Sequence, residues 1–99
     1  MILVSGVFEI DAADRDRAMA AAQVMAAASR EEGGCRKYAF YADIEKADRF
    51  RVFEEWEDLE ALETHFQTPH MAVFRQTLGE LRILSREVYR YQVVDSTKL

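Results

Sequence analysis

The sequence predicts an α+β domain whose elements follow the order β-α-β-β-α-β. Three observations indicate this class. Segments rich in β-branched and aromatic residues, with apolar side chains alternating between two faces, occur four times. Two stretches with helical spacing of apolar residues lie between them, one after the first strand and one before the last. The chain has 99 residues, which allows one core and no second one. We therefore expect a single domain over residues 1–99.

A strand over residues 2–10 and a helix over residues 15–32 are expected first. Four apolar residues share one face of the strand: Ile2, Val4, Phe8 and Ile10. We expect the Asp14 carboxylate to cap the helix by accepting from the free amides of its first turn. The run that follows is rich in Ala and Met, which favour helices, and Gly33 and Gly34 end it. Small residues on its packing face would let it lie close to a sheet: Ala18, Ala22, Met25, and Ala28 or Ser29.

A hairpin is expected in the middle of the chain. Its strands are residues 35–43 and 49–56, and residues 44–48 form the polar turn between them. Aromatic residues occur on both faces of the first of these strands, with Tyr38 and Phe40 opposite Tyr41. The second strand ends at Trp56, the only tryptophan.

Two short helices and a last strand are expected after the hairpin. Asp58 caps a helix whose apolar positions, Leu59, Leu62 and Phe66, follow helical spacing. Thr68 is the next N-cap, and Pro69 takes the first helical position, where its missing N–H costs nothing. The helix that begins there carries a stripe of His70, Val73, Phe74, Thr77, Leu78 and Leu81. Residues 83–94 form the last strand, so the core spans about residues 2–94, followed by a polar tail over residues 95–99.

This order of elements is the ferredoxin-like arrangement, in which helices cover one face of a four-stranded antiparallel sheet. The opposite face should be polar if water covers it. Leu3, Val7, Tyr41 and Phe53 nevertheless fall on that face by strand alternation, and Tyr89 and Tyr91 share a face of the last strand. An apolar exposed face of this kind is typical of an interface. We therefore predict a homodimer that packs through the sheet.

Composition excludes several classes of partner. The net charge is −5 and the 13 Lys and Arg residues are scattered, so a nucleic-acid partner is not expected. No apolar run approaches the roughly 20 residues that cross a bilayer, and the first residues lack the pattern of a signal peptide. The lone Cys35 cannot form an internal disulfide, which fits a reducing compartment. We expect a cytoplasmic protein with no membrane partner.

The candidate site is the corner between Trp56 and His70. The only Trp, the only Pro and both His residues of the chain fall in this segment. His65 borders the apolar face of its helix, and His70 lies in the first turn of the next one. Each could titrate against a small molecule, or could be a structural residue at a helix–sheet seam or a helix start. The two His lie on separate helices with no Cys, Asp or Glu at convincing ligand spacing, so no metal is expected.

The chain resembles the antibiotic-biosynthesis monooxygenase family. The resemblance is carried by Glu-Glu-Gly-Gly-Cys at residues 31–35 before an aromatic strand, and by Glu55-Trp56, His65 and Thr-Pro-His at residues 68–70 after it. It covers about residues 2–94, and the second block is closest to the quinol monooxygenase branch. The resemblance implies small ferredoxin-like proteins that pair as dimeric α+β barrels.

The resemblance also implies a chemistry. Characterised members oxidise quinols, anthrones or polycyclic phenols with O₂, without metal, flavin or haem. The protein need supply only a base or polar anchor, a stacking surface and a dry pocket. We expect His65 and His70 as the catalytic residues. Aromatic side chains would form the wall that binds a small aromatic substrate: Tyr38, Phe40, Trp56, Phe66 and Phe74. His65 should sit at the mouth of a cavity between the sheet and the last two helices, with Trp56 closing the cavity at the strand end.

Two other functions are associated with proteins of this kind. A related branch degrades haem through an Asn on the first strand, a Trp on the short helix and a His on the next helix. The likely counterparts here are Ser5 or Gly6, His65 and Arg75, so no haem and no other cofactor is expected. The remaining alternative is a non-catalytic dimeric binding or stress-response protein that holds a hydrophobic ligand in the same pocket.

Overall fold

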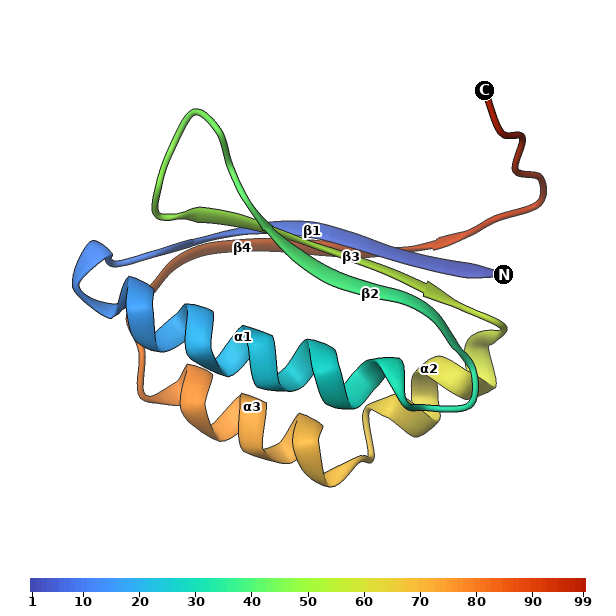
Figure 1. Ribbon diagram of the computed structural model, residues 1–99, viewed down its shortest axis with the longest axis horizontal. Coiled ribbons are helices and arrows are strands. Elements are labelled where there is room, and N and C mark those ends of the chain that lie inside the picture. The colour runs from blue at the N-terminus through green and yellow to red at the C-terminus, as the bar shows by residue number, and fades with distance from the viewer.

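The computed structural model describes all 99 residues as one antiparallel sheet covered on one side by helices (Figure 1). Along the chain the elements are β1 (Ile2–Ile10), a 3-10 turn η1 (Ala12–Asp14), α1 (Arg15–Arg30), β2 (Cys35–Ala42), β3 (Arg49–Trp56), α2 (Leu59–His65), α3 (Pro69–Gly79) and β4 (Ile83–Gln92). The strand order is β2-β3-β1-β4 and every pairing is antiparallel. The ferredoxin-like prediction is confirmed. None of the helices combines the length and the apolar character needed to span a membrane.

The helix starts follow the predicted capping residues in two of three cases. Asp58 accepts from the Ala61 amide at 2.8 Å, and Thr68 accepts from the Met71 amide at 3.3 Å. The prediction for Asp14 is wrong, because its carboxylate makes no capping bond. Asp14 instead accepts from the Arg82 amide at 2.9 Å and so joins the start of α1 to the approach of β4.

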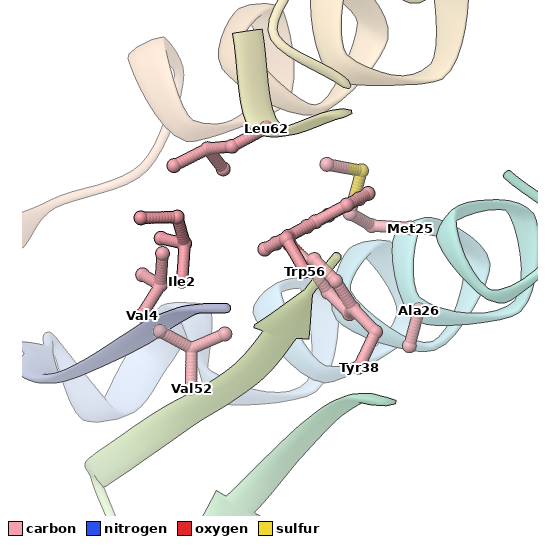
Figure 2. Packing of buried hydrophobic residues seen from close by; sticks show 8 residues of the cluster. All are labelled: Ile2, Val4, Met25, Ala26, Tyr38, Val52, Trp56 and Leu62. Atoms are coloured by element: carbon pink, nitrogen blue, oxygen red, sulfur yellow. The ribbon is translucent and has the colours of Figure 1, made fainter. Parts of the chain in front are cut away.

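The main core lies where α1 and α2 meet the sheet. Trp56 is completely buried at the end of β3, next to Met25 of α1 and Tyr38 of β2 (Figure 2). Leu62 brings α2 onto the same cluster, which also includes Ile2, Val4, Ala26 and Val52. Burial of this much apolar surface fixes α2, and with it the position of His65 at the last residue of that helix.

Helix α3 packs against α1 and lies farther from the sheet (Figure 1). The predicted apolar stripe of α3 is therefore only partly right: Val73 is 60% exposed, while Phe74 and Leu78 are half-buried. Met71, which the stripe omitted, packs against the main core instead. This placement leaves the inner face of β4 without a helix against it.

The outer face of the sheet carries no helix (Figure 1). Tyr41, Tyr89 and Tyr91 are exposed on it, and the rings of Tyr89 and Tyr91 lie 6.4 Å apart. The strand alternation predicted for this face is confirmed by the register, which pairs Leu3 with Tyr91 and Ser5 with Phe53.

Candidate functional site

One carboxylate oxygen connects both histidines of the chain. Oε2 of Glu32 lies 2.7 Å from Nδ1 of His65 and 2.7 Å from Nε2 of His70. Glu32 follows the end of α1, and the two His come from α2 and α3. Such short separations are typical of N–H groups donating to a charged acceptor.

The local sequence explains why these three residues meet. The Thr68 hydroxyl donates to the His65 carbonyl at 2.7 Å and also caps α3, so the Thr-Pro corner fixes where the first turn of α3, with His70, begins relative to His65. On the other side, Gly34 lies against α2. A Cβ at Gly34 would overlap the Cβ of Ala61, so only glycine lets the turn after Glu32 approach α2 this closely.

The hydrogen bonds define the tautomer of His65. Because a carboxylate only accepts, His65 carries its proton on Nδ1, and Nε2 keeps a free lone pair. The side chain is 1% exposed. Burial lowers the pKa of His65, with the nearby Glu32 opposing that shift. The imidazole is therefore neutral at neutral pH and able to accept a proton at Nε2.

Aromatic rings surround His65. Its ring centroid lies 4.6 Å from that of Trp56, 5.5 Å from Tyr38 and 5.8 Å from Phe66. Burial raises the pKa of Tyr38 far above its usual value, so its phenol stays protonated. His65 is thus the neutral base among these rings.

A cavity of about 530 Å³ opens beside His65, between the inner face of the sheet, α2 and α3. Its volume lies in the range of small-molecule sites. Five of the residues predicted for the site line it: Tyr38, Phe40, His65, Phe66 and Phe74. Arg86 and Arg90 of the uncovered strand β4 also line it, and neither makes an ion pair.

The chain is similar to known proteins in both sequence and fold. The sequence model described as antibiotic biosynthesis monooxygenase matches residues 1–77, from β1 into α3. The chain belongs to the antibiotic biosynthesis monooxygenase family. An uncharacterized Synechocystis protein is 31% identical over 98 residues, covering 99% of this chain and 67% of that protein.

Solved structures share the fold of this family member. A candidate antibiotic biosynthesis monooxygenase from Deinococcus radiodurans has a TM-score of 0.93 at 22% identity, covering 100% of this chain and 98% of that one. A Mycobacterium tuberculosis protein has a TM-score of 0.89 at 26% identity, covering 98% of each chain. The resemblance drawn from the sequence is confirmed at the level of family and fold.

Two predicted site residues lie elsewhere than expected in this family member. Trp56 does not close the cavity, because it is completely buried behind the cavity wall. His70 does not line the cavity either and reaches His65 only through Glu32. The Thr-Pro corner between α2 and α3 separates the two imidazoles, whose centroids lie 6.0 Å apart.

Sequence reasoning missed Glu32 as a site residue. The sequence gives no spacing signal for it, since Glu32 lies 33 residues before His65 and 38 before His70. The absence of a Cys, Asp or Glu at ligand spacing in the sequence therefore did not predict that the fold brings a distant carboxylate to both His. Glu32, His65 and His70 offer ligand-type atoms that all lie within 4.8 Å of one another, so these are the residues that could hold a cation. The two 2.7 Å hydrogen bonds account for the arrangement without one.

Sequence reasoning also missed Glu54, which lines the cavity and is 6% exposed. Its Oε1 accepts from the Trp56 indole N–H at 2.8 Å. Burial raises the pKa of Glu54 to about 7, with the Trp56 hydrogen bond opposing the shift. Strand alternation does carry the signal, because Val52, Glu54 and Trp56 share one face of β3.

Cys35 has no nucleophilic character here. Burial raises the pKa of its thiol to about 11, and Glu32 and Glu54 add to the shift. The thiol therefore stays protonated at neutral pH.

Proposed function

We propose that this protein is a cofactor-independent monooxygenase that oxidises a small aromatic quinol- or anthrone-like compound with O₂. The observation that carries the proposal is that His65, which lines an aromatic cavity, is paired with the Glu32 carboxylate through its other ring nitrogen. A buried neutral imidazole with its second nitrogen held by a carboxylate is the arrangement of a general base.

The chemistry needs a base because the substrate supplies the electrons. For an anthrone-like substrate, His65 removes one proton from the reacting CH₂ group. The resulting anion transfers one electron to O₂, and the radical pair combines to form a carbon–peroxide bond. The imidazolium of His65 then protonates the peroxide anion, which gives a hydroperoxide and leaves His65 neutral again. Loss of the second C–H proton and cleavage of the O–O bond then give a ketone and water. One CH₂ group and one O₂ are converted to one C=O group and one H₂O.

The rest of the cavity suits an aromatic anion. Phe40, Phe66 and Phe74 offer apolar faces against which planar rings can stack. Arg86 and Arg90 place positive charge at the β4 side of the cavity, where it would stabilise a phenolate or enolate. Because His70 lies outside the cavity, we assign it the role of a positioning residue that holds the Glu32 carboxylate.

Oxygen uptake with a panel of quinols and anthrones tests the proposal. The His65→Ala variant should lose on the order of 10²–10⁴-fold in turnover, the size of a general-base contribution. Thr64→Ala is the matched control, because Thr64 precedes His65 on α2 and is exposed. Wild-type protein that consumes no oxygen above autoxidation would contradict the proposal. Binding of these compounds without oxygen uptake would instead support the ligand-holding alternative.

We further propose that a second copy of the chain covers the outer face of the sheet. Exposed Tyr41, Tyr89 and Tyr91 and half-buried Phe53 support this, because an interface core is typically aromatic. We expect a total buried area near 1,600 Å², the standard size. Light scattering at micromolar concentration should give a dimer, and Phe53→Asp should give a monomer. Ile44→Asp, in the exposed turn, should remain dimeric. A monomeric wild type would contradict this assignment.

A further inference from the structure

Glu54 has an unusual place for a carboxyl group. It lies in the middle of the sheet on β3, facing Val4 of β1 and Tyr38 of β2 in the register, and it is 6% exposed. Trp56 donates to Oε1, but no group of the protein bonds Oε2. Oε2 keeps accessible surface, because Ser29 Oγ is the one fully buried side-chain N or O atom without a partner. Since Glu54 lines the cavity, a ligand there can supply a partner for Oε2.

We propose that Glu54 is a second catalytic residue, which protonates the leaving oxygen when the peroxide bond breaks. This inference rests on the proposed monooxygenase function. It divides the proton transfers between two groups, with His65 accepting from the substrate carbon and Glu54 donating to oxygen.

The geometry supports this division because one side chain positions both groups. The Trp56 indole N–H holds Glu54 at 2.8 Å, and its ring lies 4.6 Å from the ring of His65. Both Glu54 and His65 line the same cavity, from β3 and from α2. A substrate between them could contact the base on one side and the acid on the other.

For an anthrone-like substrate, both groups act on the hydroperoxide. In the hydroperoxide, His65 takes the remaining C–H proton, the electron pair forms the C=O bond, and the O–O bond breaks. The departing hydroxide takes the proton of Glu54 and leaves as water. The imidazolium of His65 then returns one proton to the Glu54 carboxylate, which restores both groups.

The charge state of Glu54 suits an acid at neutral pH. Burial and the nearby Glu32 raise its pKa to about 7, and the Trp56 hydrogen bond works against them. Other titratable or charged groups near it come from neighbouring elements: Tyr38 and Cys35 of β2, His65 of α2, and Arg86 and Arg90 of β4. Tyr38 and Cys35 are neutral at this pH, because the pKa of each is raised.

The fluorescence of Trp56 gives a readout that needs no turnover, because it is the only tryptophan and bonds Glu54 directly. A pH titration of wild-type protein should show a transition near pH 7, the pKa of Glu54. The transition should be absent in Glu54→Gln and retained in Glu55→Gln. Glu55 is the matched control, since it neighbours Glu54 on β3 but faces the outer side and pairs with Lys37. A transition that survives Glu54→Gln would overturn the assignment.

The pH profile of anthrone oxidation then tests the catalytic role. The turnover of wild type should fall at alkaline pH, because Glu54 must be protonated to act as the acid. The Glu54→Gln variant should lack this alkaline limb, and its turnover should be lower by about 10²-fold or more. Glu54→Asp, which keeps the acid, should restore the limb. A uniform rate loss with the limb intact, or wild-type behaviour of Glu54→Gln, would overturn the proposal. Failure of wild type to consume oxygen would overturn the monooxygenase function itself, which separates the two outcomes.

Discussion

Nδ1 of His65 and Oε2 of Glu32 lie 2.7 Å apart although 33 residues separate them in the chain. The contact connects the end of α1 to the end of α2 and determines which nitrogen of the imidazole carries the proton. Tertiary packing therefore selects the tautomer of the candidate base, and the carboxylate of Glu32 stabilises that tautomer because it only accepts hydrogen bonds.

Replacement of Glu32 by Gln should therefore abolish most activity while leaving the fold intact. The Gln amide can donate to Nδ1, which would move the proton of His65 to Nε2 and remove the free lone pair. We expect a loss in kcat on the order of 10²–10⁴-fold with little change in KM. Glu31→Gln, at an exposed neighbouring position, should behave as wild type in steady-state oxygen uptake. Equal activity of both variants would exclude Glu32 from catalysis.

Stability should fall as pH rises through the range set by Glu54. Its pKa is raised from 4.5 to about 7 in the folded protein, so the native state binds more protons than the unfolded state between these values. The contribution to stability is present at low pH and is lost toward pH 7, by about 3 kcal/mol at most. Denaturant unfolding from about pH 5 to about pH 8 should show this decline. Glu54→Gln should flatten it, and an unchanged slope would argue against a buried acid.

His65 contributes with the opposite sign. Its pKa is lowered in the folded protein, mainly by burial, so the unfolded state binds protons more readily below about pH 6.5. The stability that His65 contributes is present above its pKa in the unfolded state. It is lost as the pH falls through its pKa in the folded state. Below about pH 6.5, His65→Ala should therefore have a flatter pH dependence than wild type in denaturant titrations. A steeper dependence would mean that the buried imidazole is charged.

The sequence was sufficient for the fold because each element carries its own local signal. The β1 alternation, the Thr68–Pro69 helix start and the Asp58 cap all lie within a few residues of what they determine. The prediction that Asp14 caps α1 was wrong because a carboxylate that can cap a helix can equally accept from a distant amide, here that of Arg82.

The site was only partly predictable for the same reason. Local pattern placed His65 beside the apolar face of its helix, but only the packing of α1 against the end of α2 brings Glu32 to it. Trp56 was assigned to the wall although full burial at the strand end removes it from the cavity. Glu54 could have been predicted to face inward, since it alternates with Val52 and Trp56 on β3 and therefore shares their face of the sheet.

Trp56→Ala should cost more stability than any change at the candidate base. The indole is completely buried in the main core, and its removal should lower the free energy of unfolding by about 3–5 kcal/mol. His65→Ala removes a smaller ring and should cost clearly less in the same denaturant titration. If the two variants were equally unstable, the activity loss of His65→Ala would reflect unfolding and would not identify a base.

Gly34 provides the last test, because it controls the approach of Glu32 to α2 without touching the cavity. A Cβ at Gly34 would overlap the Cβ of Ala61, so Gly34→Ala should push the turn away from α2. We expect a loss of about 1–3 kcal/mol in stability, the usual cost of overpacking, and a large loss of oxygen uptake as Glu32 leaves His65. The double variant Gly34→Ala with Ala61→Gly restores the space and should recover activity. Its free energy of unfolding should stay lower by about 1 kcal/mol, because glycine lies within α2. Gly33→Ala, where an added Cβ meets no atom, is the control. If activity did not return in the double variant, the contact between Gly34 and Ala61 would not be what positions the Glu32–His65 pair.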